Sequence, residues 1–230
     1  MKFAVLVFPG SNCDHDCYHA IKHTLGQNAE FVWHKDGSLK GFDVVMVPGG
    51  FSYGDYLRPG AIACFSPVLG ALSDFINKGK PAFGICNGFQ ILTEAGFLPG
   101  TLAQNESMKF ICKNTNLRVE TSNSFVTSNM AKGDILDMPI AHMDGRYTAD
   151  KDTLARLEDD DRVLFRYCDA KGEITKEANP NGSARNIAGI LSAKRNVAGM
   201  MPHPERACEN ALGGENGRFV FESIMASVGV

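Results

Sequence analysis

The chain has 230 residues, with 23 Lys and Arg against 26 Asp and Glu, so its formal net charge is −3 with neutral histidines. This balance gives no electrostatic attraction for nucleic acid or for an anionic membrane. Hydrophobic residues make up 44% and charged residues 21%, proportions that exclude disordered, collagen-like and coiled-coil proteins. The length favours a single domain over residues 1–230.

The first hundred residues alternate between strands and helices. We expect strands at residues 2–8, 31–33, 42–47 and 80–85. Apolar spacings of three and four predict a helix that ends at Gly26, a long amphipathic helix over 61–78, and a helix from 90 that ends at Gly96. This alternation implies right-handed crossovers and a parallel sheet covered by helices.

Beyond about residue 105 the pattern changes to short strands and turns. Strands are predicted at residues 109–112, 117–120, 163–167, 187–191 and 197–201, and an amphipathic helix at 219–228. Several of these strands are expected to pair antiparallel. The fold class is therefore α/β: a three-layer α/β/α sandwich, flavodoxin-like, with a mostly parallel central sheet and an antiparallel extension.

The seven cysteines bear on the cellular compartment. They are an odd number, scattered through a chain large enough to fold without disulfides. The apolar stretch at residues 3–8 is too short for a signal-peptide core, and no segment approaches a membrane-spanning length. We therefore expect reduced thiols and a cytoplasmic protein.

A cysteine between two glycines is the clearest candidate for chemistry. Cys86 lies where a buried strand meets a helix, with Gly84 and Gly88 on either side. The glycines remove the Cβ clashes of a tight turn, and the helix N-terminus favours thiolate over thiol. We interpret Cys86 as a nucleophile, and a buried structural cysteine is the alternative.

The best candidate for the base is His203, in a His-Pro-Glu sequence after the apolar residues 197–201. Glu205 would accept a hydrogen bond from one ring nitrogen and leave the other facing the thiol. A solvated histidine at a strand end is the alternative. Oxyanion donors would be the backbone N–H of Asn87 and an N–H freed by Gly49 and Gly50, unless those glycines form an ordinary turn.

Two other groups of residues carry weaker signals. Cys13, His15, Cys17 and His19 resemble a metal cluster, but residues two apart on a helix lie on opposite sides, so we expect no metal there. The sequence also has no phosphate-binding loop, so we expect no nucleotide site.

Three motifs, in this order and spacing, resemble the class I (triad) glutamine amidotransferases: Pro-Gly-Gly at 48–50, Gly-x-Cys-x-Gly-x-Gln at 84–90 and His-Pro-Glu at 203–205. Longer segments at 8–14, 48–58 and 139–146 extend the resemblance over essentially the full length. They narrow it to the glutaminase subunits that serve a purine-biosynthetic synthase. Asp144 departs from the pattern, which has glutamate there.

The resemblance implies that Cys86 attacks the side-chain amide of glutamine, while His203 moves the protons and Glu205 orients His203. It assigns oxyanion and substrate binding to Gly49, Gly50, Phe51, Asn87 and Gln90. Ammonia would pass to a synthase subunit that uses ATP and magnesium to convert formylglycinamide ribonucleotide to its amidine, with a small accessory subunit beside it. This chain itself would need no cofactor.

Three other hypotheses share the cysteine turn: another class I amidotransferase, a γ-glutamyl hydrolase or cysteine peptidase, and a redox sensor. The segment Phe-Ser-Tyr-Gly-Asp-Tyr-Leu-Arg at 51–58 is not expected in a hydrolase of the second type. The pair His203 and Glu205 argues against a sensor, which needs only an exposed thiol of low pKa.

Overall fold

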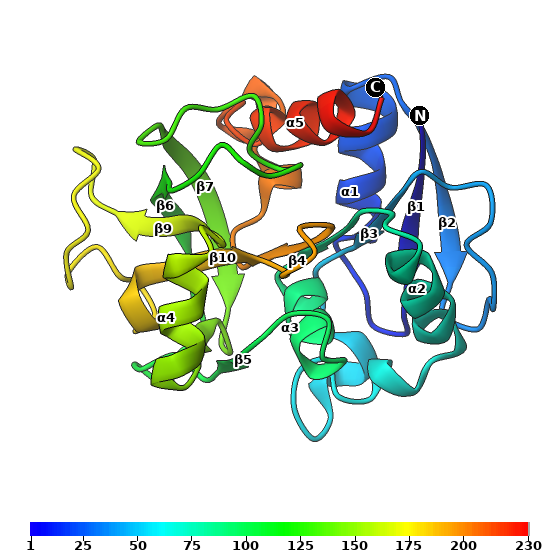
Figure 1. The fold of residues 1–230 in the computed structure, drawn as a ribbon, viewed down its shortest axis with the longest axis horizontal. Coiled ribbons are helices and arrows are strands. Elements are labelled where there is room, and N and C mark those ends of the chain that lie inside the picture. The colour runs from blue at the N-terminus through cyan, green and yellow to red at the C-terminus, as the bar shows by residue number, and fades with distance from the viewer. Residues whose placement is uncertain (230) are drawn as a thin grey trace.

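Parallel and antiparallel strands share one large sheet in this computed structural model, which describes residues 1–229 (Figure 1). Within those residues the sheet has nine strands, in the order β2-β1-β3-β4-β11-β10-β9-β6-β7. The parallel part comprises β2 (Asn28–Trp33), β1 (Lys2–Val7), β3 (Val44–Val47), β4 (Ala82–Ile85) and β11 (Val197–Met200). The antiparallel part comprises β10 (Ile187–Leu191), β9 (Val163–Cys168), β6 (Ile111–Val119) and β7 (Ile135–His142). The predicted parallel sheet with an antiparallel extension is confirmed.

Helices cover both faces of this sheet (Figure 1). They are α1 (Asp14–His19), which continues as a π-turn over Ala20–Thr24, α2 (Pro67–Asn77), α3 (Asn87–Glu94), α4 (Lys151–Asp159) and α5 (Arg218–Val228). Helices α1 and α5 lie together on one side, and α2 and α3 on the other. The three-layer architecture is confirmed, and a small separate sheet pairs β5 (Thr101–Ala103) with β8 (Arg146–Thr148).

Strand β4 determines where functional side chains gather. It is buried along its whole length and pairs in parallel with β3 on one side and β11 on the other. Gly84 lies opposite Val47 of β3 and Gly199 of β11. The three carboxyl ends therefore meet at one edge of the sheet, where ligands bind in open parallel sheets.

Some predicted elements were wrong in extent. The helix expected over 61–78 is interrupted, because Ser66 precedes a proline and takes an extended conformation (φ −72°, ψ 138°), so that α2 begins only at Pro67. The strands expected at 109–112 and 117–120 are one strand, β6, whose polar middle pairs with β7. Helix α3 begins at Asn87, three residues earlier than expected.

Among the strands and α-helices of residues 1–229, four were not predicted: β5, β7, β8 and α4. Buried and more exposed residues do alternate along strand β7, where Leu136, Met138 and Ile140 are buried. Pro139 lies in the middle of this strand, and a proline there argues against a strand in the sequence. Helix α4 is capped by Asp150, whose side chain accepts a hydrogen bond from the Thr153 N–H at 2.8 Å. No helix within residues 1–229 combines the length and apolar character needed to cross a membrane.

The close approach of α3 to β3 gives a first prediction. A Cβ on Gly88 would collide with the backbone carbonyl oxygen of Val47, whereas one on Gly70, in α2, would meet no atom within 4 Å. Gly88→Ala is expected to lower the free energy of unfolding by about 1–3 kcal/mol or more. Gly70→Ala is expected to raise it by about 0.5–1 kcal/mol. Urea unfolding of both variants measures the two effects, and equal values would contradict the packing described.

Candidate active site

Cys86 occupies the strained turn that its flanking glycines suggested. Its backbone is left-handed (φ 52°, ψ −108°), and its N–H donates to the carbonyl oxygen of Met200 in β11 at 2.8 Å. A Cβ on Gly84 would lie 2.7 Å from the carbonyl oxygen of Gly88, so the turn has no room for larger residues. The thiol is buried, with its sulfur 3.8 Å from the carbonyl oxygen of Ala141 in β7.

His203 and Glu205 form a buried hydrogen-bonded pair just beyond β11. The distance from His203 Nδ1 to Glu205 Oε1 is 2.6 Å, and both side chains are about 1% exposed. The backbone N–H of His203 donates to the Pro139 carbonyl oxygen at 2.9 Å, which anchors the segment to β7. Burial disfavours the charged ring, but the carboxylate of Glu205 and the nearby Cys86 thiol outweigh it and hold the pKa of His203 well above its usual range.

Two thiols lie against the His203 ring, and they differ in their surroundings. Both Cys86 and Cys13 contribute to the raised pKa of His203. Cys86 lines a small cavity, whereas Cys13 lies beside Gly49 and accepts a hydrogen bond from Arg206 at 3.1 Å. Burial raises the pKa of the Cys13 thiol. The geometry therefore favours Cys86 as the nucleophile, and sequence reasoning had missed that Cys13 reaches this site.

The cavity at the Cys86 thiol is very small. Its volume is about 30 Å³, room for roughly two water molecules. Its lining residues are Gly50, Phe51, Asp55, Cys86, Gln90, Ala141, His142, Met143 and Asp144. The structure thus brings Gly50, Phe51 and Gln90, all expected at the site, around the thiol.

The side chains of Asn87 and Gln90 connect the loops that surround the cavity. Asn87 accepts a hydrogen bond from the Ser52 N–H at 3.0 Å and donates to Asp55 at 3.2 Å and to Gln90 at 2.9 Å. Gln90 in turn donates to the carbonyl oxygen of Asp144 at 2.6 Å. The polar atoms of both side chains are thus engaged with the protein, which suits a positioning role. The Asn87 backbone N–H stands in the first turn of α3, where amides lack a partner within the helix.

The glycine segment after β3 is held by the loop after β1. Gly49 accepts a hydrogen bond from the Cys13 N–H at 3.3 Å, and Phe51 donates its N–H to Gly10 at 3.1 Å. Gly50 has φ 136°, and a Cβ there would lie 2.7 Å from the backbone nitrogen of Asn12. The Phe51 amide is therefore already used, which leaves the Gly50 N–H as the oxyanion donor that this segment can offer.

Two carboxylates, Asp55 and Asp144, line the cavity, and sequence reasoning gave neither a role. Burial and the neighbouring Asp144 raise the pKa of Asp55 from 3.8 to about 6. The hydrogen bond from Asn87 acts in the opposite direction and lowers this pKa, but its effect is smaller. Burial also raises the pKa of Asp144. The only signal for Asp55 was its place in the 51–58 motif, since a lone aspartate in a loop is ordinary.

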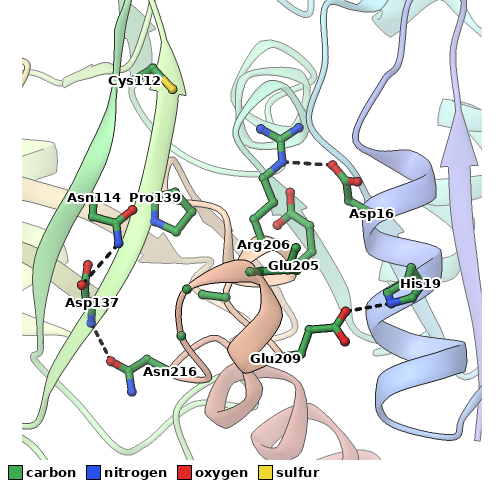
Figure 2. A pocket seen from close by; sticks show the side chains of 14 residues that line it. Asp16, His19, Cys112, Asn114, Asp137, Pro139, Glu205, Arg206, Glu209 and Asn216 are labelled. Carbon is green, nitrogen blue, oxygen red and sulfur yellow. Dashed lines mark hydrogen bonds and ion pairs between the residues drawn. The ribbon is translucent and has the colours of Figure 1, made fainter.

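A second, larger cavity of about 870 Å³ lies on the side of Glu205 and Arg206 (Figure 2). Arg206 bridges to Asp16 of α1 at 3.0 Å, and His19 bonds Glu209 at 2.8 Å. His19 is held by Glu209, and the absence of a metal at Cys13, His15, Cys17 and His19 stays an expectation. Within residues 1–229, the donor atoms of Cys13, His203 and Glu205 all lie within 4.8 Å of one another.

The whole chain is similar to known proteins. Residues 1–214 match the model of the CobB/CobQ-like glutamine amidotransferase domain. The chain is 54% identical over 229 residues to phosphoribosylformylglycinamidine synthase subunit PurQ from Salinibacter ruber, covering 100% of this chain and 97% of that protein. It is also 54% identical to the protein of the same name from Aquifex aeolicus, covering 98% of this chain and 100% of that one.

Solved structures agree with this similarity. A chain in the structure of PurLQS from Thermotoga maritima superposes with a TM-score of 0.88 at 43% identity, covering 98% of both chains. A glutamine amidotransferase, also from Thermotoga maritima, superposes with a TM-score of 0.58 at 13% identity, covering 100% of this chain and 92% of that one. The second likeness concerns the fold alone.

The raised pKa of Asp55 predicts a pH-dependent stability. The folded protein keeps this proton up to about pH 6, whereas the ordinary pKa is 3.8, so the folded state binds more protons between these values. The contribution of Asp55 to the free energy of unfolding therefore falls as the pH rises through this window. Asp55→Asn is expected to gain stability over the wild type from pH 4 to 7, on the order of 1 kcal/mol after allowance for solvent screening.

Urea unfolding at several pH values measures this difference. Asp74→Asn, on the exposed side of α2, is the matched control and should follow the wild type. A difference between Asp55→Asn and the wild type that does not change with pH would contradict the description of Asp55.

Proposed function

The chain belongs to the CobB/CobQ-like glutamine amidotransferase family, and we propose that it is the glutaminase subunit of a phosphoribosylformylglycinamidine synthase. In this role it hydrolyses glutamine to glutamate and ammonia. The ammonia then serves a synthase subunit that converts formylglycinamide ribonucleotide to formylglycinamidine ribonucleotide in purine biosynthesis. The observation that carries the proposal is the buried pair of His203 and Glu205 beside a cysteine in a strained turn, in a chain about 54% identical to proteins of that name.

The geometry supports a thioester mechanism. The Cys86 sulfur attacks the carbon of the glutamine side-chain amide, and His203 takes the thiol proton and passes it to the departing nitrogen, so that ammonia leaves and a γ-glutamyl thioester remains. His203 then takes a proton from water as the water attacks the thioester, and returns it to the sulfur as the C–S bond breaks, which releases glutamate and restores the thiol. Glu205, hydrogen-bonded to Nδ1, keeps the other ring nitrogen directed at the reacting atoms.

Groups around the cavity match the charges of the substrate and of the transition state, which are a positive ammonium group and a negative oxyanion. The N–H groups of Asn87 and Gly50 would stabilise the oxyanion of the tetrahedral intermediates. Asp55 and Asp144 supply negative charge close to the thiol, and free glutamine carries a positive α-ammonium group. We assign the recognition of that group to the two carboxylates, and Phe51 to the wall of the same pocket.

The synthase chemistry requires partners. The sequence has no phosphate-binding loop, so ATP and magnesium would bind the synthase subunit, and this chain would need no cofactor. The related PurLQS structure supports a synthase partner and a small accessory subunit. All seven cysteines are free thiols, which is compatible with a cytoplasmic location.

The two thiols beside His203 provide a matched test of the nucleophile. In a reconstituted complex, Cys86→Ser is expected to lose glutamine-dependent synthesis by a factor on the order of 10⁴ or more, the usual loss for a member of such a triad. Synthesis with added ammonium salt should continue, since only ammonia production is removed. Cys13→Ser should lose far less. The measurements are glutamate release and product formation with each nitrogen source.

Covalent labelling gives an independent readout. An irreversible glutamine analogue is expected to modify Cys86 alone among the seven cysteines, as mapped by peptide mass spectrometry. Retained glutaminase activity in Cys86→Ser, or labelling of Cys13 in its place, would overturn the assignment.

The cavity at Cys86 is narrow, with a volume of about 30 Å³, so we expect the loops around it to move when glutamine binds. The loop beside the cavity is backbone-strained, with positive φ at Tyr53, Asp55 and Leu57, and it exposes Tyr56 and Leu57 by 71% and 74%. A partner that covers these apolar side chains would reposition the loop, open the cavity and align the Gly50 N–H.

We therefore predict that the free subunit is a poor glutaminase. The absence of one oxyanion donor typically costs about 10²–10³-fold in rate, and synthase binding should restore at least that factor. Glutamate release is measured for the chain alone, with synthase, and with synthase plus ATP and formylglycinamide ribonucleotide. Equal rates under the three conditions would show an autonomous hydrolase and would favour a γ-glutamyl hydrolase activity.

A further inference from the structure

Three metal-ligating side chains converge behind the proposed nucleophile. The Cys13 sulfur, a ring nitrogen of His203 and a carboxylate oxygen of Glu205 lie within 4.8 Å of one another. They come from two segments far apart in sequence, the loop between β1 and α1 and the turn after β11. All three side chains are buried, with at most 3% of each residue exposed.

Two polar atoms of this cluster are unpaired in residues 1–229. His203 Nε2 and Glu205 Oε2 are buried and have no hydrogen-bond partner there. A buried polar atom without a partner typically costs about 1–3 kcal/mol. His203 Nε2 is the nitrogen that the proposed mechanism directs at the reacting atoms, so the catalytic role accounts for it. Glu205 Oε2 has no such role, and a bound ion explains a buried carboxylate oxygen that has no partner.

The chemistry of the donor set selects the ion. A thiolate, an imidazole and a carboxylate form a mixed set of sulfur, nitrogen and oxygen ligands, which suits Zn²⁺ and not Ca²⁺ or Mg²⁺. We propose that Cys13, His203 and Glu205 form an inhibitory binding site for a thiophilic divalent cation, with Zn²⁺ as the expected ion. Zinc bonds to such atoms are about 2.0–2.3 Å long. The 2.6 Å hydrogen bond between His203 Nδ1 and Glu205 Oε1 must therefore open, and the Cys13 sulfur must move inward, for one ion to bind all three side chains.

The larger cavity gives the ion a route to these ligands. Glu205 and Arg206 line it together with Asp16 and Glu209, whose carboxylates attract a cation (Figure 2). Arg206 donates a hydrogen bond to the Cys13 sulfur at 3.1 Å and must give up that contact. Asp16, which Arg206 already bonds at 3.0 Å, remains as its partner. Binding replaces the thiol proton of Cys13 and the proton on the coordinating nitrogen of His203 by the ion, and both protons leave to solvent.

Occupation of this site would stop glutamine hydrolysis. The ion would take lone pairs of His203 and Glu205 that the proton transfers require, and its charge would oppose a protonated ring. This consequence depends on the proposed glutaminase function, whereas the binding itself does not. Cys86 lies against the same ring and is a neighbour of the ion in this arrangement.

Direct binding is tested first, without reference to activity. The metal-free chain is titrated with Co²⁺, which reports thiolate ligation by a charge-transfer absorption, and the Co²⁺ is then displaced by Zn²⁺. One ion per chain is expected. Cys13→Ser should lose the thiolate absorption and weaken Zn²⁺ binding at least about tenfold, the lower end of what even an outer-shell partner of a metal contributes. Cys112→Ser is the matched control, because Cys112 is an exposed thiol on the same cavity.

Inhibition is then measured in the complex with synthase, relative to the metal-free rate of each variant. Wild type and Cys112→Ser should be inhibited by Zn²⁺ and recover with a chelator, and Cys13→Ser should need at least about ten times more Zn²⁺. Circular dichroism of Cys13→Ser checks that it is folded. Equal Zn²⁺ binding and inhibition in wild type and Cys13→Ser, or no thiolate absorption in the wild type, would overturn the proposal. A metal-free complex without glutaminase activity would instead overturn the proposed function.

Discussion

The site depends on the parallel pairing of β4 between β3 and β11. Because Gly84 is aligned with Val47 and Gly199, the chain leaves all three strands at the same level of the sheet. Cys86 then follows β4 by one residue, and His203 follows β11 by three. A shift of β11 by one residue would turn its side chains to the opposite face. The glycines at 84 and 88 are required because α3 packs directly onto this strand junction.

Burial of the His203 and Glu205 pair imposes the second constraint. Removing an ion pair from water costs several kcal/mol per ion, and good geometry is needed to offset it. The 2.6 Å contact and the backbone bond from His203 to Pro139 provide that geometry. The pair is therefore held in place by its own hydrogen bond and by β7, which suits proton transfer, but the same packing leaves little space beside Cys86. Access must come from the loops around the cavity.

The sequence was most informative where a reactive residue lies in a turn that only small neighbours allow. The turn at Cys86 could be predicted because only small residues fit beside it, and the buried strands because they are continuously apolar. Strand β7 and helix α4 were missed because Pro139 interrupts the first pattern and the second helix is short and polar. Cys13 and Asp55 were missed because their positions beside His203 and Asp144 arise from tertiary contacts. Local sequence carries no signal for such contacts.

The loop after β3 is the part of the site whose conformation is least stabilised by contacts within this chain. Left-handed backbone costs about 1–2 kcal/mol for each non-glycine residue, and Tyr53, Asp55 and Leu57 all adopt it. The Tyr53 hydroxyl is hydrogen-bonded with His34 Nδ1 at 2.8 Å and with Ser66 Oγ at 2.9 Å, and these contacts hold one end of the loop. The exposed Leu57 side chain makes no comparable contribution. A synthase surface that buries Leu57 would add apolar contact where strain is already present, so partner binding acts on this loop rather than on the buried pair of His203 and Glu205.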